Sequence, residues 1–290
     1  MATNTPFGQR LGLVLEGGAM RGIYTAGVLD VFLEAGIMPD VVVGVSAGAL
    51  HGCSYVAGQK GRSIRYYRKY HSDKHFMGLY SLLTTGDVVG TKFCYEDIPL
   101  RLDPFDEAAF EKAPVDFYVT VTNVRTGKPE YILCDELKVG SKMDVIRAGA
   151  SMPLCSKMVE WNGNLYLDGG VSDSIPYAKM KDFGCRKSIV VLTQPAGYLK
   201  QPAAMAPFEA MYRKYPAFVE AMRGRDQMYN TEVCAVEQAA KQGDVFLIRP
   251  SKLLHVGRME HDIEVLNAQY ELGRQDARNQ MDAMREWMER

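Results

Sequence analysis

Apolar residues near the start of the chain alternate between short unbroken runs and helical spacing. Leu11–Leu15 and Val41–Val45 are unbroken apolar runs, typical of strands that are buried on both faces. Between them, apolar positions recur at helical spacing over residues 23–33, and Gly36 supplies a stop signal. A second helical pattern begins at Ala47. The chain is therefore predicted to start as a strand, helix, strand, helix unit.

The same alternation continues along the rest of the chain. Further strands are predicted at 117–122, 130–133, 158–161, 165–167, 188–192 and 245–248, and helices at 141–149, 176–182, 207–222, 226–241 and 260–288. Buried strands separated by helices imply an α/β fold with a mostly parallel sheet covered on both faces. We expect one domain over residues 1–290, with a core at about 10–195 and a helical elaboration, strand and helix at about 197–290.

Composition and charge narrow the class of protein. The 290 residues are 47% hydrophobic and 24% charged, which is an ordinary globular composition, and the net charge of -1 gives no field that attracts nucleic acid. The six cysteines form no C-x-x-C pair, so neither a disulfide framework nor a metal site is expected. No secretory segment and no run of about 20 apolar residues is present. These features predict a cytoplasmic protein without a bound metal.

A G-x-S-x-G motif lies where the second strand ends and a helix begins. In Gly44-Val45-Ser46-Ala47-Gly48, the glycines make room for a tight turn that projects the Ser46 hydroxyl above the sheet edge. This is the context of a nucleophile elbow. The alternative interpretation is a serine that only caps the N-terminus of the helix.

A glycine-rich turn, Glu16-Gly17-Gly18-Ala19-Met20-Arg21-Gly22, occupies the corresponding junction one unit earlier. Backbone N–H groups of such a turn, at a helix N-terminus, favour negative charge and suit an oxyanion. The rival interpretation is a dinucleotide phosphate site. Its G-x-G-x-x-G pattern is broken at Ala19, and no ribose-binding carboxylate follows the second strand, so no cofactor is expected.

Asp168 is the candidate base for the serine. It ends a short strand and is followed by Gly169 and Gly170, which allow close approach of the backbone. An aspartate before glycine is also common turn chemistry, and that interpretation is favoured for this motif taken alone.

Together the three elements resemble the patatin-like phospholipases. That family has a glycine-rich oxyanion loop, matched by residues 17–22, a G-x-S-x-G serine, matched by residues 44–48, and a later D-G-[GA] aspartate, matched by residues 168–170. Residues 150–153, Ala-Ser-Met-Pro, resemble a further family signature, and the resemblance spans about residues 11–192. Ala19 in place of a third glycine is a mild departure that narrows the φ allowed there.

The resemblance implies a three-layer α/β/α fold and a Ser-Asp dyad without a catalytic histidine. Ser46 then attacks an ester carbonyl and Asp168 accepts its proton. The N–H groups of Gly17, Gly18 and Ala19 hold the oxyanion, and Arg21 supports that loop or adds positive charge near it. The implied activity is hydrolysis of carboxylic esters of lipids, with phospholipid or lysophospholipid as the leading substrate. The alternatives are an acyltransferase on the same scaffold and a non-catalytic lipid-binding or regulatory protein.

Histidines and basic segments complete the candidates. An α/β-hydrolase triad would need His255 or His261, but only two strands precede Ser46, which argues against that fold. His51 is expected to pack. The basic, aromatic residues 62–75 are interpreted first as a solvated helix face and second as a peripheral membrane contact. The Met-rich residues 205–222 are interpreted as core packing, or as an acyl-pocket wall or lid.

Overall fold

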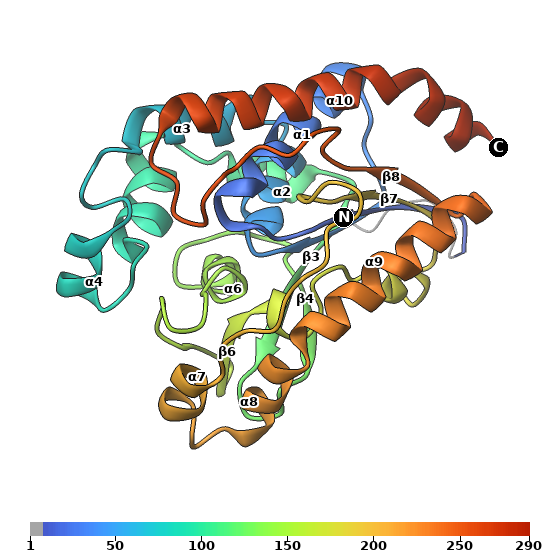
Figure 1. Cartoon of the computed structure of the whole chain (residues 1–290). Helices are drawn as coiled ribbons and strands as arrows, with labels where there is room; N and C mark the ends of the chain where they lie inside the picture. Colours follow the sequence, from blue (N-terminus) through green and yellow to red (C-terminus); the bar gives the residue numbers. More distant parts are fainter. Residues whose placement is uncertain (1–7) are drawn as a thin grey trace.

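Eight strands form one sheet in the computed structural model, which describes residues 8–290. The sheet order is β5-β6-β3-β2-β1-β7-β8, and β4 pairs with β3. Figure 1 labels β3, β4, β6, β7 and β8 of this sheet. The strands β3, β2, β1, β7 and β8 run parallel, whereas β4, β6 and β5 join as antiparallel strands. The strands are β1 Arg10–Leu15, β2 Val41–Val45, β3 Asp116–Asn123, β4 Pro129–Leu133, β5 Val159–Trp161, β6 Asn164–Asp168, β7 Cys185–Val191 and β8 Val245–Ile248.

Helices connect these strands and cover both faces of the sheet. The α-helices are α1 Ile23–Ala35, α2 Ala47–Val56, α3 Arg62–Tyr70, α4 Leu79–Thr85, α5 Glu107–Lys112, α6 Lys142–Gly149, α7 Ala206–Met211, α8 Pro216–Arg223, α9 Arg225–Gln242 and α10 Ile263–Glu289. A π-helix, η2, spans Phe93–Leu102, and 3₁₀ turns lie at η1 Ala19–Gly22, η3 Gly169–Val171 and η4 Ala178–Lys181. Across residues 8–290, no helix has the length and apolarity to cross a bilayer.

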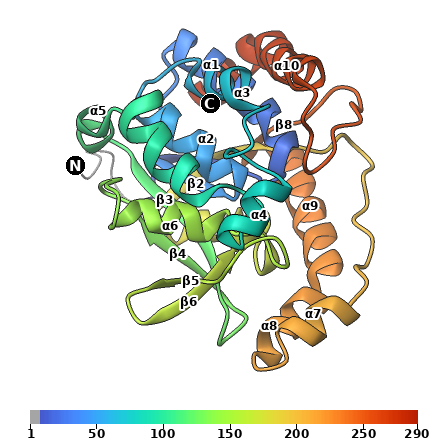
Figure 2. The same cartoon turned by 90° about the vertical axis from the view of Figure 1, so that its left-hand side faces the viewer.

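The alternating side chains of β1 show how the layers pack. Leu13 and Leu15 join a core with α1, α2, α6 and α10, whereas Val14 faces the opposite way and packs with α9. Figures 1 and 2 show α10 and α9 on different sides of the sheet. Because both faces of the central strands are covered, these strands carry apolar residues at successive positions. The fold is the expected three-layer α/β/α arrangement.

Two of the predicted helices differ in the structure. The single helix expected over 207–222 is two helices, α7 and α8, because Pro216 begins α8 and disfavours helical geometry at the residue before it. The helix expected over 176–182 is only the 3₁₀ turn η4, which follows Pro176. The other strands and helices named above from the sequence form close to their predicted bounds.

The long helix α10 is held against α1 by a close crossing of backbones. A Cβ added at Gly27 would lie 2.1 Å from the carbonyl oxygen of Tyr270, and one at Gly273 would lie 2.1 Å from that of Tyr24. Only glycine at both positions permits this approach. The Tyr24 hydroxyl also donates to Asp276 at 3.1 Å, so the end of the chain is anchored on the first helix of the core.

Candidate active site

Ser46 lies on a tight turn between β2 and α2. Its backbone adopts φ 52° and ψ -122°, in a region that favours glycine, so the turn is strained. A Cβ at Gly48 would lie 2.3 Å from the carbonyl oxygen of Leu15, which explains the glycine there. The expected elbow geometry therefore forms, and it directs a buried serine to the carboxyl edge of the parallel strands.

Strand register brings Asp168 to the same edge. Val45, which precedes the serine, pairs with Thr120 of β3, and the next residue of β3, Val121, pairs with Asp168 of antiparallel β6. Two strands of opposite direction thus end beside each other. The side chain of Ser46 lies near enough to the Asp168 carboxyl group to lower the pKa of that group.

The environment of Asp168 favours its protonated form more than water does. Burial raises the pKa of its carboxyl group above the ordinary value, and the nearby Ser46 hydroxyl and the charge of Arg225 lower it only in part. The backbone N–H of Gly170 donates to Asp168 Oδ1 at 2.8 Å and fixes the carboxyl group. Such a carboxylate is a better proton acceptor than an exposed one.

The glycine-rich turn packs directly against the elbow. A Cβ at Gly17 would lie 2.8 Å from the Cβ of Ser46, so only glycine lets the two turns meet. Among the described residues, no acceptor takes a hydrogen bond from the amides of Gly17 or Gly18. Ala19 has φ 49°, so the alanine adopts a left-handed conformation despite its Cβ. The turn presents unpaired donors beside the serine.

A buried carboxyl group, Glu16, supports this turn. It accepts hydrogen bonds from the Thr193 backbone N–H at 2.6 Å and from the Tyr229 hydroxyl at 2.9 Å. Burial raises the pKa of Glu16. The hydroxyl of Thr193 donates to the carbonyl of Gly17 at 3.1 Å. Thr193, which follows β7, therefore holds both the Glu16 carboxyl group and the Gly17 carbonyl group.

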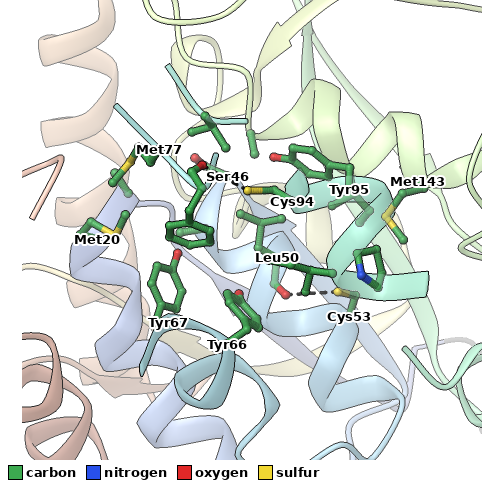
Figure 3. A pocket seen from close by; sticks show the side chains of 18 of the residues that line it. Met20, Ser46, Leu50, Cys53, Tyr66, Tyr67, Met77, Cys94, Tyr95 and Met143 are labelled. Atoms are coloured by element: carbon green, nitrogen blue, oxygen red, sulfur yellow. Dashed lines mark hydrogen bonds between the residues drawn. The ribbon is translucent and has the colours of Figure 1, made fainter. Parts of the chain in front are cut away.

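An apolar cavity opens on one side of Ser46. Figure 3 shows Met20, Met77, Cys94 and Tyr95 around the serine, with Leu50 further along the cavity. Its other lining residues include Tyr66, Tyr67, Phe76, Ile98, Met143 and Ile146. This lining suits a hydrocarbon chain.

A second cavity, which we call the polar cavity, lies on the other side of Ser46. Asp168, Glu16 and the glycine-rich turn line it, as do four basic side chains: Arg21, Lys200, Arg225 and Arg258. The two cavities share Ala19, Ser46, Met152 and Arg258. The serine therefore stands where an apolar and a charged space meet.

Comparison with known proteins fits this geometry. The family model described as patatin-like phospholipase matches residues 13–180, which is more than half of the chain. The chain belongs to the patatin-like phospholipase family. A second model, a domain of unknown function (DUF6363), matches residues 215–289.

Relatives of this patatin-like chain differ in how much of it they share. The uncharacterized protein YjjU of Escherichia coli (strain K12) is 28% identical over 91% of this chain and 75% of its own length. Lysophospholipase nte1 of Aspergillus terreus and lysophospholipase NTE1 of Saccharomyces cerevisiae are each 30% identical, over 61% and 63% of this chain, but the match covers 11% of either protein. Among solved structures, VipD from Legionella pneumophila gives a TM-score of 0.48 at 13% identity, over 96% of this chain and 67% of VipD.

The remaining glycines of the patatin-like motifs lie where the sequence predicts. Gly44 and Gly48 flank the elbow, Gly22 ends η1, and Gly169 and Gly170 form the turn after Asp168. Arg21 lines the polar cavity, and its Nε is buried without a hydrogen-bond partner among the described residues.

The histidines lie away from Ser46. His255 and His261 are exposed and line neither cavity. His51 is buried with Nδ1 3.0 Å from Ser63 Oγ, and burial lowers its pKa to about 4, so it packs as expected.

Residues 62–75 and 205–222, for which the sequence allowed two interpretations each, contain both cavity-lining side chains and side chains that pack or pair elsewhere. In α3, Tyr66 and Tyr67 turn inward to the apolar cavity, while Arg65 pairs with Asp103 at 2.7 Å. In the Met-rich segment, Phe208 and Met222 line the polar cavity. Tyr212 instead packs inside, where its hydroxyl accepts from Leu154 N at 3.0 Å.

Sequence reasoning missed the basic residues of the polar cavity other than Arg21. Lys200, Arg225 and Arg258 come from a loop, the first residue of α9 and a second loop. No local pattern marks them, since each is separated from Ser46 by more than 150 residues of sequence.

Proposed function

We propose that this chain is a serine acyl hydrolase that cleaves carboxylic esters of lipids through Ser46 and Asp168. The supporting observation is the position of Ser46, beside the buried carboxyl group of Asp168 and at the junction of an apolar cavity and a polar one. The lysophospholipase relatives support a lipid ester as substrate.

The geometry supports a two-step reaction. Ser46 Oγ attacks the ester carbonyl while Asp168 takes the hydroxyl proton, and the alcohol leaves with that proton. Water, deprotonated by Asp168, then attacks the acyl-enzyme ester. The bond between the acyl carbon and Ser46 Oγ breaks, Asp168 returns the proton to Ser46 Oγ, and the carboxylic acid leaves. The amides of Gly17, Gly18 and Ala19 stabilise the oxyanion in both steps, each donor contributing about 3 kcal/mol. Because a carboxylate is a weak base for an alcohol, these donors carry much of the acceleration.

Ester hydrolysis and covalent labelling test this function together. The wild type should hydrolyse p-nitrophenyl butyrate and react with a fluorophosphonate probe. Ser46→Ala should abolish labelling, and both Ser46→Ala and Asp168→Asn should lower kcat/KM at least about 10³-fold. Ser251→Ala and Asp282→Asn change exposed residues outside both cavities and serve as matched controls. A wild type that neither hydrolyses esters nor labels, or a fully active Asp168→Asn, contradicts the proposal.

Peripheral contact with a lipid surface is proposed at α4 rather than α3. Leu79 and Leu83 of α4 are 69% and 76% exposed. The helix lies between Met77 and Val89, which form a short antiparallel bridge and both line the apolar cavity. An exposed apolar helix next to the apolar cavity favours uptake of a lipid from a lipid surface into that cavity. Flotation with phospholipid vesicles tests this contact. A cytoplasmic location stays a prediction from the sequence.

A further inference from the structure

The polar cavity collects more positive than negative charge. Arg21 of η1, Lys200, Arg225 of α9 and Arg258 line it together with only two carboxyl groups, Glu16 and Asp168. Burial, followed by the charges of Arg225, Arg21 and Arg258, lowers the pKa of Lys200 to about 8, although Glu16 raises it. Four cations that converge on one space repel each other unless an anion joins them.

These cations form no close ion pair among the described residues. Arg225 Nε donates to the carbonyl of Gly170 at 2.6 Å, which orients the guanidinium group, and the Lys200 ammonium lies 4.2 Å from the centre of the Tyr229 ring. Arg21 keeps a buried Nε without a partner.

The two carboxyl groups are occupied by other donors. Glu16 accepts from Thr193 and Tyr229, and Asp168 accepts from the Gly170 backbone N–H. Arg21 and Lys200 lower the pKa of Glu16, and Arg225 and Lys200 lower that of Asp168, but burial raises the pKa of both carboxyl groups. Two carboxyl groups therefore balance at most half of the positive charge of the four basic side chains. Guanidinium groups bind phosphate oxygens in pairs and are well suited to such an anion.

Ser46 lines both cavities, so the two sides of an ester at this serine point into different surroundings. We infer that the polar cavity binds the phosphate-bearing headgroup of a lysophospholipid through Arg21, Lys200, Arg225 and Arg258, while the apolar cavity holds its acyl chain. This inference rests on the proposed hydrolase function and specifies its substrate class.

The inference also gives a role to the C-terminal part of the chain. Arg225 and Arg258 lie in residues 215–289, the part that matches a domain of unknown function. Tyr229 of the same part donates to Glu16 and lies under Lys200. This segment completes the phosphate site over the serine.

A pair of substrates that differ only in the phosphate tests the site. The ratio of kcat/KM for 1-palmitoylglycerol 3-phosphate to that for 1-palmitoylglycerol should be well above one in the wild type. It should fall about tenfold in Arg258→Gln and in Lys200→Gln, because each loses a charge-assisted hydrogen bond to phosphate. Arg213→Gln, at an exposed arginine outside both cavities, should leave the ratio unchanged.

The outcomes separate this inference from the proposed function. A wild type that hydrolyses both substrates with no preference, or folded variants with an unchanged ratio, overturns the phosphate site and leaves the hydrolase intact. A wild type that hydrolyses neither and does not label overturns the hydrolase itself. Glycerol 3-phosphate should compete with p-nitrophenyl butyrate more strongly than inorganic phosphate does. The reverse order indicates a site for free phosphate and overturns the headgroup assignment.

Discussion

The Tyr229 hydroxyl donates a hydrogen bond of 2.9 Å to the buried carboxyl group of Glu16, 213 residues earlier in the chain. Glu16 directly precedes the glycine-rich turn beside Ser46, and Tyr229 lies in α9. The bond therefore ties the C-terminal segment to the turn that presents the oxyanion donors.

Loss of this bond should weaken both the fold and the reaction. Tyr229→Phe leaves one oxygen of Glu16 buried without a donor, so the free energy of unfolding should fall by about 1–3 kcal/mol. In ester hydrolysis kcat should fall with little change in KM, because the amides of the turn act on the transition state. Urea denaturation and steady-state kinetics measure the two effects. Tyr198→Phe, at a ring packed against Tyr229, is the control, and equal stability of both variants would refute the link.

The hydrolysis rate should depend on the ionisation of Asp168. Since burial raises the pKa of this carboxyl group above 3.8, kcat/KM should increase with pH through the raised value, as the base becomes ionised. The pH profile with p-nitrophenyl butyrate measures this rise. Asp168→Asn should show only residual activity without that pH dependence. If the residual kcat/KM of Asp168→Asn rises with pH over the same range as that of the wild type, a group other than Asp168 causes the pH dependence.

The same carboxyl group should cost stability near neutral pH. A raised folded-state pKa means that its contribution to stability is fully present below pH 3.8 and lost as the pH rises through the raised value. Asp168→Asn should therefore unfold at a higher temperature than the wild type at pH 7, although it is inactive. Thermal unfolding by circular dichroism checks this. A lower midpoint than that of the wild type would contradict the assigned electrostatic cost.

The acidic pair Glu232 and Asp173 should make the free energy of unfolding fall at high pH. Glu232 of α9 faces Asp173, and burial followed by the charge of Asp173 raises the Glu232 pKa from 4.5 to about 9. Its contribution to stability is present below pH 4.5 and lost as the pH rises through 9. Glu232→Gln keeps an oxygen to accept from Ser174 and Ile175 and should remove this loss. Unfolding free energies from pH 5 to 10 test it, with exposed Glu220→Gln as control. Parallel curves for wild type and Glu232→Gln would disprove the effect.

The apolar cavity should set the acyl-chain length. Leu50→Trp places an indole ring in the apolar cavity, beyond the residues around Ser46, and should reduce hydrolysis of p-nitrophenyl palmitate far more than that of the butyrate. Kinetics on the two esters give the ratio. Leu199→Trp, at a side chain that is 62% exposed, controls for the added ring. Equal losses on both esters would indicate that the chain binds elsewhere.

The local pattern of the sequence determined most of the elements and the positions of all three motifs, at residues 17–22, 44–48 and 168–170. Unbroken apolar runs mark the strands because these are covered on both faces, and the glycines around Ser46 and before Arg21 mark turns where backbones approach closely. Pro216 is itself a local signal that separates α7 from α8, because proline disfavours helical geometry at the residue before it. That residues 1–290 form one domain stays a prediction, which is supported by the pairing of β8 with β7.

Tertiary structure alone decided what meets at the serine. Asp168 reaches Ser46 because β6 joins β3 antiparallel in one register, and register depends on pairing between distant segments. Lys200, Arg225 and Arg258 converge from three separate segments, so no spacing in the sequence marks them. Local periodicity specifies which residues are buried in each element. The field around a buried carboxyl group is the sum of charges brought together by packing of the whole chain.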